Sequence, residues 1–177
     1  SMDILISSNL ERLIYDLSDC DDKAVVEWQE KLSKTGKYEV SEKVFSRIKE
    51  EFFAAYCDDK QTKATIKRVF DKFSYLCDTH TAVAVSAYEE YKLKTGDNKK
   101  VIIASTANPY KFSQSVLSAI TGEVSTADEY EQSEKLEQIS KLPMPSQLSG
   151  LKTKPVRFPK SIDVQDMSAE VIAALKL

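Results

Sequence analysis

The chain has 177 residues, of which 42% are hydrophobic and 30% are charged, and its formal net charge is −3. This composition is typical of a single globular domain with a buried core and excludes an intrinsically disordered chain. The negative charge argues against nucleic acid or an anionic membrane as a partner, and no apolar run is long enough to span a membrane. Because the N-terminus does not have the features of a signal peptide, we expect a cytoplasmic protein.

The pattern of apolar residues predicts a mostly helical chain. Residues 2–6 are an apolar run that predicts a short strand, and amphipathic helices should follow it along residues 7–96. Residue types that cap helix starts precede three of these helices: Ser7, Ser8 or Asn9 for the first, Asp21 or Asp22 for the second, and Ser41 for the third. The cysteines are Cys20, Cys57 and Cys77. Their odd number and wide spacing indicate neither a disulfide framework nor a metal site.

A strand followed directly by a helix is predicted within residues 97–122. The apolar run at residues 101–104 suits a strand that is buried on both faces, Asn108 suits a helix cap, and Gly122 should end the helix. In an open α/β sheet, ligands bind at the carboxyl ends of the strands. Ser105, Thr106 and Asn108 are therefore candidate ligand-binding residues.

The remaining C-terminal part is polar and then rich in proline. Residues 125–142 predict a solvent-exposed helix, residues 143–159 an extended segment, and the residues from 167 onward a short helix. Two predicted strands are too few for a parallel sheet, which usually has four or more. We therefore expect a helix-dominated α/β fold, with few strands of its own, that belongs to a longer enzyme.

Three segments of the chain resemble the C-terminal portion of the threonine synthase family, in the same order and at similar separations. They are SMDILISSNLERLIY, DTHTAVAVSAYEEY and IIASTANPYKFSQSV. The resemblance covers essentially the whole chain. It implies part of the large domain of a fold type II enzyme that uses pyridoxal phosphate and converts O-phosphohomoserine and water to threonine and phosphate.

The resemblance implies that residues 1–177 are the C-terminal region of such an enzyme. Residues 1–96 would form a helical segment with a leading strand, residues 97–122 a strand, turn and helix that line the cofactor site, and residues 123–177 the C-terminal helices and an extended tail. In this family, the Schiff-base lysine and the glycine-rich phosphate loop lie upstream.

The glycines agree with this expectation, since they are too scattered for such a loop; they are Gly36, Gly96, Gly122 and Gly150. We therefore expect the chain alone to be inactive and not to bind pyridoxal phosphate. Its partner would be the N-terminal part of the same enzyme.

The resemblance also assigns candidate roles near the cofactor. Fold type II enzymes place a Ser or Thr hydroxyl opposite the pyridine nitrogen; Thr106 matches that position and Ser105 is the alternative, although Thr106 could simply stabilise the turn. Lys111 could contact the substrate phosphate or pair with a surface acid. Asn108 stands where family members often carry histidine, which puts any role of that imidazole in doubt.

Two other segments supply substrate-side candidates. Arg12 offers a bidentate fork that suits a phosphate, with Asn9 beside it, but a cap at Asn9 and a pair between Arg12 and Asp16 would explain both residues structurally. His80 is the only histidine, and the family usually has Asp-Pro-His-Thr where this chain has Thr79 before it. We expect His80 to be a helix-start residue that faces the cleft rather than an acid or base.

Other classes of protein fit the sequence less well. The chain could be a non-catalytic helical interaction module that uses Tyr88, Tyr91 and the acidic stretch near Tyr130, or a regulatory relative that kept the fold and lost catalysis. In the isolated chain, an incomplete sheet would expose apolar surface, so we expect this chain to self-associate.

Overall fold

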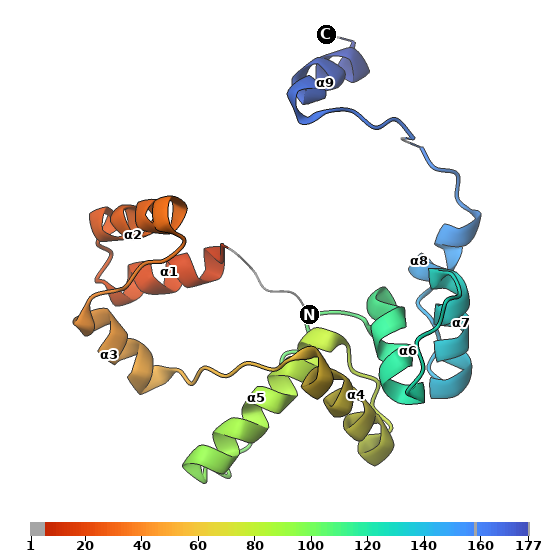
Figure 1. Cartoon of the computed structure of the whole chain (residues 1–177), viewed down its shortest axis with the longest axis horizontal. Helices are drawn as coiled ribbons and strands as arrows, with labels where there is room; N and C mark the ends of the chain where they lie inside the picture. Colours follow the sequence, from red (N-terminus) through yellow and green to blue (C-terminus); the bar gives the residue numbers. More distant parts are fainter. Residues whose placement is uncertain (1–5, 158, 177) are drawn as a thin grey trace. The chain divides into compact units, whose positions relative to one another are not determined.

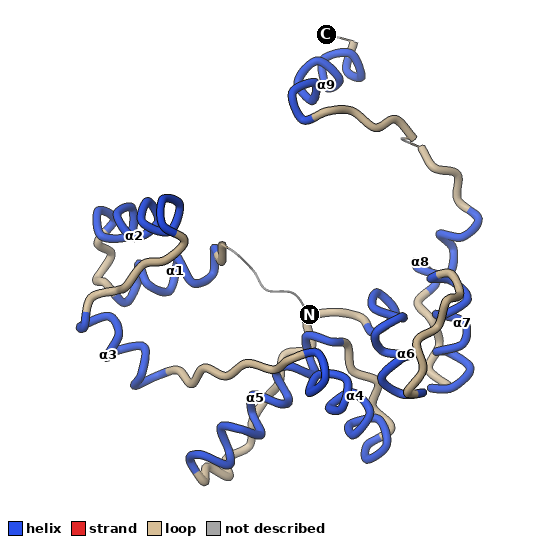
Figure 2. The backbone as a smooth tube through the Cα atoms, viewed as in Figure 1, coloured by secondary structure: helices blue, strands red, loops and turns tan. Residues whose placement is uncertain are grey.

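The computed structural model describes residues 6–157 and 159–176, and these residues form helices joined by loops, with no β-strand among them (Figures 1 and 2). The helix-dominated fold predicted from the sequence is confirmed. The chain divides into two units, Ser1–Leu142 and Pro143–Leu177.

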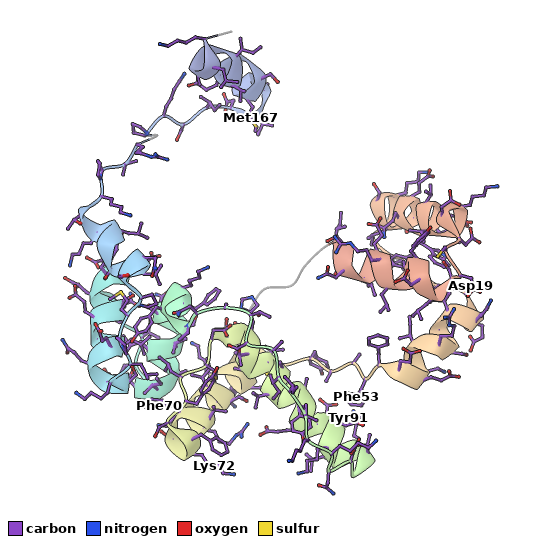
Figure 3. The ribbon with its side chains drawn as sticks, turned by 180° about the vertical axis from the view of Figure 1, so that it is seen from behind. Asp19, Phe53, Phe70, Lys72, Tyr91 and Met167 are labelled. Atoms are coloured by element: carbon purple, nitrogen blue, oxygen red, sulfur yellow. The ribbon has the colours of Figure 1, made fainter. Side chains whose placement is uncertain are left out.

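The first three helices of the larger unit form one packed group. They are α1 (Ser8–Leu17), α2 (Asp22–Thr35) and α3 (Glu42–Glu51). α1 packs on both α2 and α3 around a small apolar core; its members are Ile14, Leu17, Val25, Trp28 and Val44. Asp19, labelled in Figure 3, joins the end of α1 to α3 through ion pairs with Lys43 and Arg47. Lys43 and then Arg47 hold the pKa of Asp19 below its ordinary value.

The next group of helices carries the candidate functional site. It consists of α4 (Asp59–Phe73), α5 (Thr79–Thr95), the short 3-10 helix η1 (Pro109–Phe112), α6 (Ser113–Thr121) and α7 (Glu129–Ser140). α4 packs against α5 and α6, and α6 packs against α7. The buried apolar residues of this group are Ile66, Val69, Leu76, Cys77, Ala82, Tyr110, Val116, Leu117, Ala119 and Leu136. An edge-to-face contact between Phe53 and Tyr91, at 5.4 Å between ring centroids, lies where the chain runs from α3 past α5 (Figure 3).

α7 is not the fully solvent-exposed helix that its polar sequence predicts. Leu136 is completely buried, and Gln132 and Ser133 are buried with it. The hydroxyl oxygens of Ser133 and Ser113 lie 2.6 Å apart, so this hydrogen bond satisfies polar groups in the interface with α6. A helix face that is buried through serine and glutamine does not show in the apolar pattern.

The second of the two predicted strands is not found. Residues 2–5 of the first lie outside the described residues. Residues 101–104, predicted as a buried strand, form no strand, and the side chain of Ile102 is 97% exposed. A strand exists only when a neighbour pairs with its backbone N–H and C=O groups, and the described part of this chain supplies no such neighbour.

Most of the glycines end helices. Gly96 and Gly122 have φ values of +70° and +79° and follow the last residues of α5 and α6. This left-handed conformation is one that glycine adopts without a steric cost. Gly36 ends α2 in the same way. These glycines therefore have a structural role at helix ends.

The smaller unit contains short helices and an extended segment. They are α8 (Ser146–Ser149), η2 (Gly150–Thr153), η3 (Val164–Asp166) and α9 (Met167–Leu175). Lys160 pairs with Glu170 of α9, while the side chains of Met167 and Leu175 are exposed. In the described parts of both units, no helix is long and apolar enough to cross a membrane.

Candidate functional site

A buried carboxylate organises the start of α5. Asp78 is the N-cap of this helix and its side chain is 0% exposed. Its Oδ1 accepts hydrogen bonds from the backbone N–H groups of His80, at 2.8 Å, and Thr81, at 3.4 Å. Because a buried charge is costly without donors, the free N–H groups of the helix start are what make this position tolerable.

Side chains on both sides of Asp78 join the same cluster. His80 Nδ1 lies 3.2 Å from Asp78 Oδ1, and the imidazole ring lies 5.1 Å from the Phe112 ring, measured between centroids. The Thr81 hydroxyl donates to Asp78 Oδ2 and also contacts Ser105 Oγ at 3.2 Å. His80 and Ser105, which were predicted from separate motifs, are therefore brought together.

Ser105 is held from a second side as well. The hydroxyl of Tyr75, in the loop between α4 and α5, donates to Ser105 Oγ at 3.4 Å. We call Tyr75, Asp78, His80, Thr81 and Ser105 the Asp78 cluster. Sequence reasoning missed Tyr75, for which the sequence carries no signal. It used Asp78 and Thr81 only as parts of a motif, although an aspartate at a helix start was a sign of the cap.

The residues after Ser105 behave differently from one another. Thr106 is exposed and has no recorded partner among the described residues. Asn108 accepts a hydrogen bond from the backbone N–H of Tyr110 at 3.0 Å, so it is the cap that its sequence position predicts. Tyr110 is buried and its hydroxyl donates to the carbonyl of Leu142. Burial raises the pKa of Tyr110, and this anchored ring fixes the chain that follows Ser105 and Thr106.

Lys111 lies beside a surface hollow rather than in the Asp78 cluster. The hollow has a volume of about 550 Å³, and Lys111 shares its lining with Asp128, Glu129 and the buried Gln132. The two carboxylates make this hollow unfavourable for a phosphate. A contact between Lys111 and the substrate phosphate would have to form outside it.

Asn9 and Arg12 belong to the α1–α3 group, whereas the Asp78 cluster belongs to the α4–α7 group. Ser7, not Asn9, caps α1, because the Ser7 hydroxyl accepts from the backbone N–H of Leu10. Arg12 Nη1 donates to Asn9 Oδ1 at 3.1 Å, in place of the expected pair with Asp16. The structure thus keeps these two candidates together but does not join them to His80 or Ser105.

Cys77 precedes Asp78 and yields a prediction about pH. Its side chain is 1% exposed, and burial raises the pKa of the thiol from 9.0 to about 11. The folded chain therefore favours the protonated thiol, so this stabilisation is complete below pH 9 and is lost as the pH rises toward 11. Over this pH range, we expect the unfolding free energy of Cys77→Ala to fall by about 2 kcal/mol less than that of the parent chain, as measured by urea denaturation.

Cys57→Ala is the matched control, because this thiol is less buried, and it should keep the slope of the parent chain. Equal slopes in the parent chain and in Cys77→Ala would contradict the assignment.

Comparisons with known proteins agree with the geometry. The model of the threonine synthase C-terminal region matches residues 81–172, more than half of this chain. Threonine synthase from Saccharomyces cerevisiae is 34% identical over 136 residues, which cover 69% of this chain and 26% of that protein. The enzyme from Pseudomonas aeruginosa is 34% identical over 123 residues, covering 70% and 26%. Human threonine synthase-like 1 is 30% identical over 120 residues, covering 68% and 16%.

Solved structures show the same relationship. The crystal structure of yeast threonine synthase is similar over 99% of this chain and 35% of that chain, with a TM-score of 0.73 and 28% identity. The structure of threonine synthase with bound pyridoxal phosphate from Brucella melitensis covers 75% of this chain and 28% of that one, with a TM-score of 0.61 and 34% identity. The chain spans about a quarter of the length of the yeast and Pseudomonas proteins. It belongs to the threonine synthase family and corresponds to the family's C-terminal region.

Proposed function

We propose that this chain is the C-terminal part of a pyridoxal-phosphate-dependent lyase that converts O-phospho-L-homoserine and water to L-threonine and phosphate. The observation that carries the proposal is the Asp78 cluster, in which one hydrogen-bonded network joins two of the three family-like segments. The relative from Brucella melitensis that holds pyridoxal phosphate supports the choice of cofactor.

The residues present fit a pyridine ring at Ser105 and Thr106. The Ser105 oxygen accepts from Tyr75, while the Thr81 hydroxyl beside it gives its single hydrogen to Asp78. Both hydroxyls lie on exposed residues. When bound, the cofactor supplies an electron sink for carbanion chemistry. We propose that this pair offers a neutral hydroxyl to the ring nitrogen; the family motif favours Thr106, and Ser105 is the alternative.

A neutral hydroxyl at this point would matter for the chemistry. A carboxylate there would favour a protonated ring nitrogen, whereas a hydroxyl favours it less. Ser105 or Thr106 would therefore moderate the electron sink. His80, which is partly exposed beside Phe112, would face the same region and help to exclude water there.

Other parts of the reaction need the rest of the enzyme. We propose that the Schiff-base lysine and the phosphate loop lie in the N-terminal part, and that this part covers the exposed residues 101–104. The exposure of Val101 and Ile102 supports such a covering surface. The isolated chain would then be inactive and would not retain pyridoxal phosphate. Three further expectations stay predictions: self-association of the isolated chain, a cytoplasmic location, and substrate contacts from Asn9, Arg12 or Lys111.

A non-catalytic member of the family is the second candidate. Asn108 stands where relatives often carry histidine, and its side chain is used to cap η1. An imidazole at this point could take part in proton transfer, whereas the amide cannot. If that imidazole is needed, the chain would keep the fold and a binding role only.

We expect this chain joined to its N-terminal part to form threonine from O-phosphohomoserine in the presence of pyridoxal phosphate, and the chain alone to form none. The reason is that the chain contributes one wall of the cofactor site without the lysine that holds the cofactor. Threonine is measured by chromatography and cofactor binding by absorbance. A joined protein that binds the cofactor without forming threonine would favour the non-catalytic candidate.

Ser105→Ala and Thr106→Val in the joined protein separate the two hydroxyls. The variant that removes the ring-nitrogen contact should lose about 1–3 kcal/mol, seen as roughly 5- to 150-fold weaker cofactor retention or slower turnover. The other variant should change both quantities little. If neither variant moves them, the cofactor contact lies elsewhere and both residues only shape the turn.

A further inference from the structure

The two oxygens of the Asp78 carboxylate serve different partners. Oδ1 faces the imidazole of His80 and the backbone N–H groups of the helix start, whereas Oδ2 accepts the hydroxyl of Thr81. An ionised carboxylate has acceptors and no hydrogen to donate. Every group that contacts Asp78 must therefore direct a hydrogen toward it.

This requirement decides which nitrogen of the His80 imidazole carries the hydrogen. A neutral imidazole carries one N–H, and the hydrogen bond made by one ring nitrogen decides where that hydrogen sits. His80 Nδ1 lies 3.2 Å from Asp78 Oδ1, with the Thr79 hydroxyl 3.4 Å away as a second neighbour. The hydrogen therefore lies on Nδ1, and Nε2 is the nitrogen with a free lone pair. The Phe112 ring, 5.1 Å away between centroids, packs beside the imidazole.

The hydrogen bond between Asp78 and Thr81 also affects Ser105. The Thr81 hydroxyl donates its single hydrogen to Asp78 Oδ2, and its oxygen lies 3.2 Å from Ser105 Oγ, which accepts from Tyr75. Asp78 thereby fixes the hydroxyl that neighbours Ser105.

We propose that Asp78 is a positioning residue that sets the hydrogen of His80 with one oxygen and the hydroxyl of Ser105, through Thr81, with the other. Asp78 touches neither substrate nor cofactor in this assignment. One buried charge thus leaves a basic Nε2 on His80 and fixes the hydroxyl that neighbours Ser105. The importance of this arrangement for turnover rests on the proposed function, whereas the arrangement itself does not.

The test is the tautomer of His80 in the 177-residue chain, read from nitrogen-15 chemical shifts above the titration of the ring. His80 is the only histidine in the sequence, so one set of imidazole signals reports on it. We expect the neutral ring to carry its hydrogen on Nδ1. A hydrogen on Nε2, or ring shifts equal to those of free histidine, would overturn the proposal. Neither cofactor nor substrate is present, so this outcome is independent of the proposed activity.

Asp78→Ser provides the matching variant. Serine also caps helices, but it has one oxygen and no charge, so the His80 hydrogen should shift to Nε2. Asp128→Ser is the control, because Asp128 caps α7 with hydrogen bonds of 2.8 Å from Tyr130 and Glu131, and it should leave the His80 tautomer unchanged. If Asp78→Ser retains the hydrogen on Nδ1, the proposal is wrong; if this variant does not fold, the parent spectrum still decides.

Thr81→Val tests whether the two oxygens of Asp78 act separately on their partners. It removes the hydroxyl that uses Oδ2 and should leave the hydrogen of His80 on Nδ1, with Thr81→Ser as the conservative control. A shift of that hydrogen in Thr81→Val alone would show that the two oxygens do not act separately.

Discussion

A carboxylate buried at the start of α5 is the constraint on which the candidate site depends. Removing the Asp78 charge from water is tolerable only because backbone N–H groups, an imidazole and a hydroxyl supply hydrogens to it. Thr81 is shared between this carboxylate and Ser105. The hydrogen bonds that this one charge requires therefore connect residues that follow α4 with the segment before η1.

The segment that carries Ser105 and Thr106 is fixed at its far end by different contacts. Tyr110 packs in the core and donates to Leu142, while Ser113 and Ser133 join α6 to α7. Between these anchors, residues 101–106 remain largely exposed. Such an arrangement suits one side of a binding site, in which the contacts of this unit hold the segment and the rest of a larger enzyme would complete the site.

Local signals in the sequence predicted much of this structure. Asp21, Ser41 and Asn108 cap helices as predicted, because a cap depends on residues a few positions apart. The strand at residues 101–104 could not be judged locally, since a strand requires a partner. The contacts of Asp78 with Thr81 and of Thr81 with Ser105 depend on how α5 packs beside a distant segment, so the family resemblance indicated the region but not the network. The buried face of α7 was missed because its serine and glutamine hide the apolar period.

The coupling between Thr81 and Ser105 tests the central claim most directly. Thr81→Val, Ser105→Ala and the double variant complete a cycle whose unfolding free energies are measured by urea denaturation of the chain. If the Asp78 charge joins the two segments through this hydroxyl pair, the double variant should differ from the sum of the single variants by about 0.5–3 kcal/mol. Effects that add to within about 0.3 kcal/mol would show that the two residues are independent and that the network does not hold the site together.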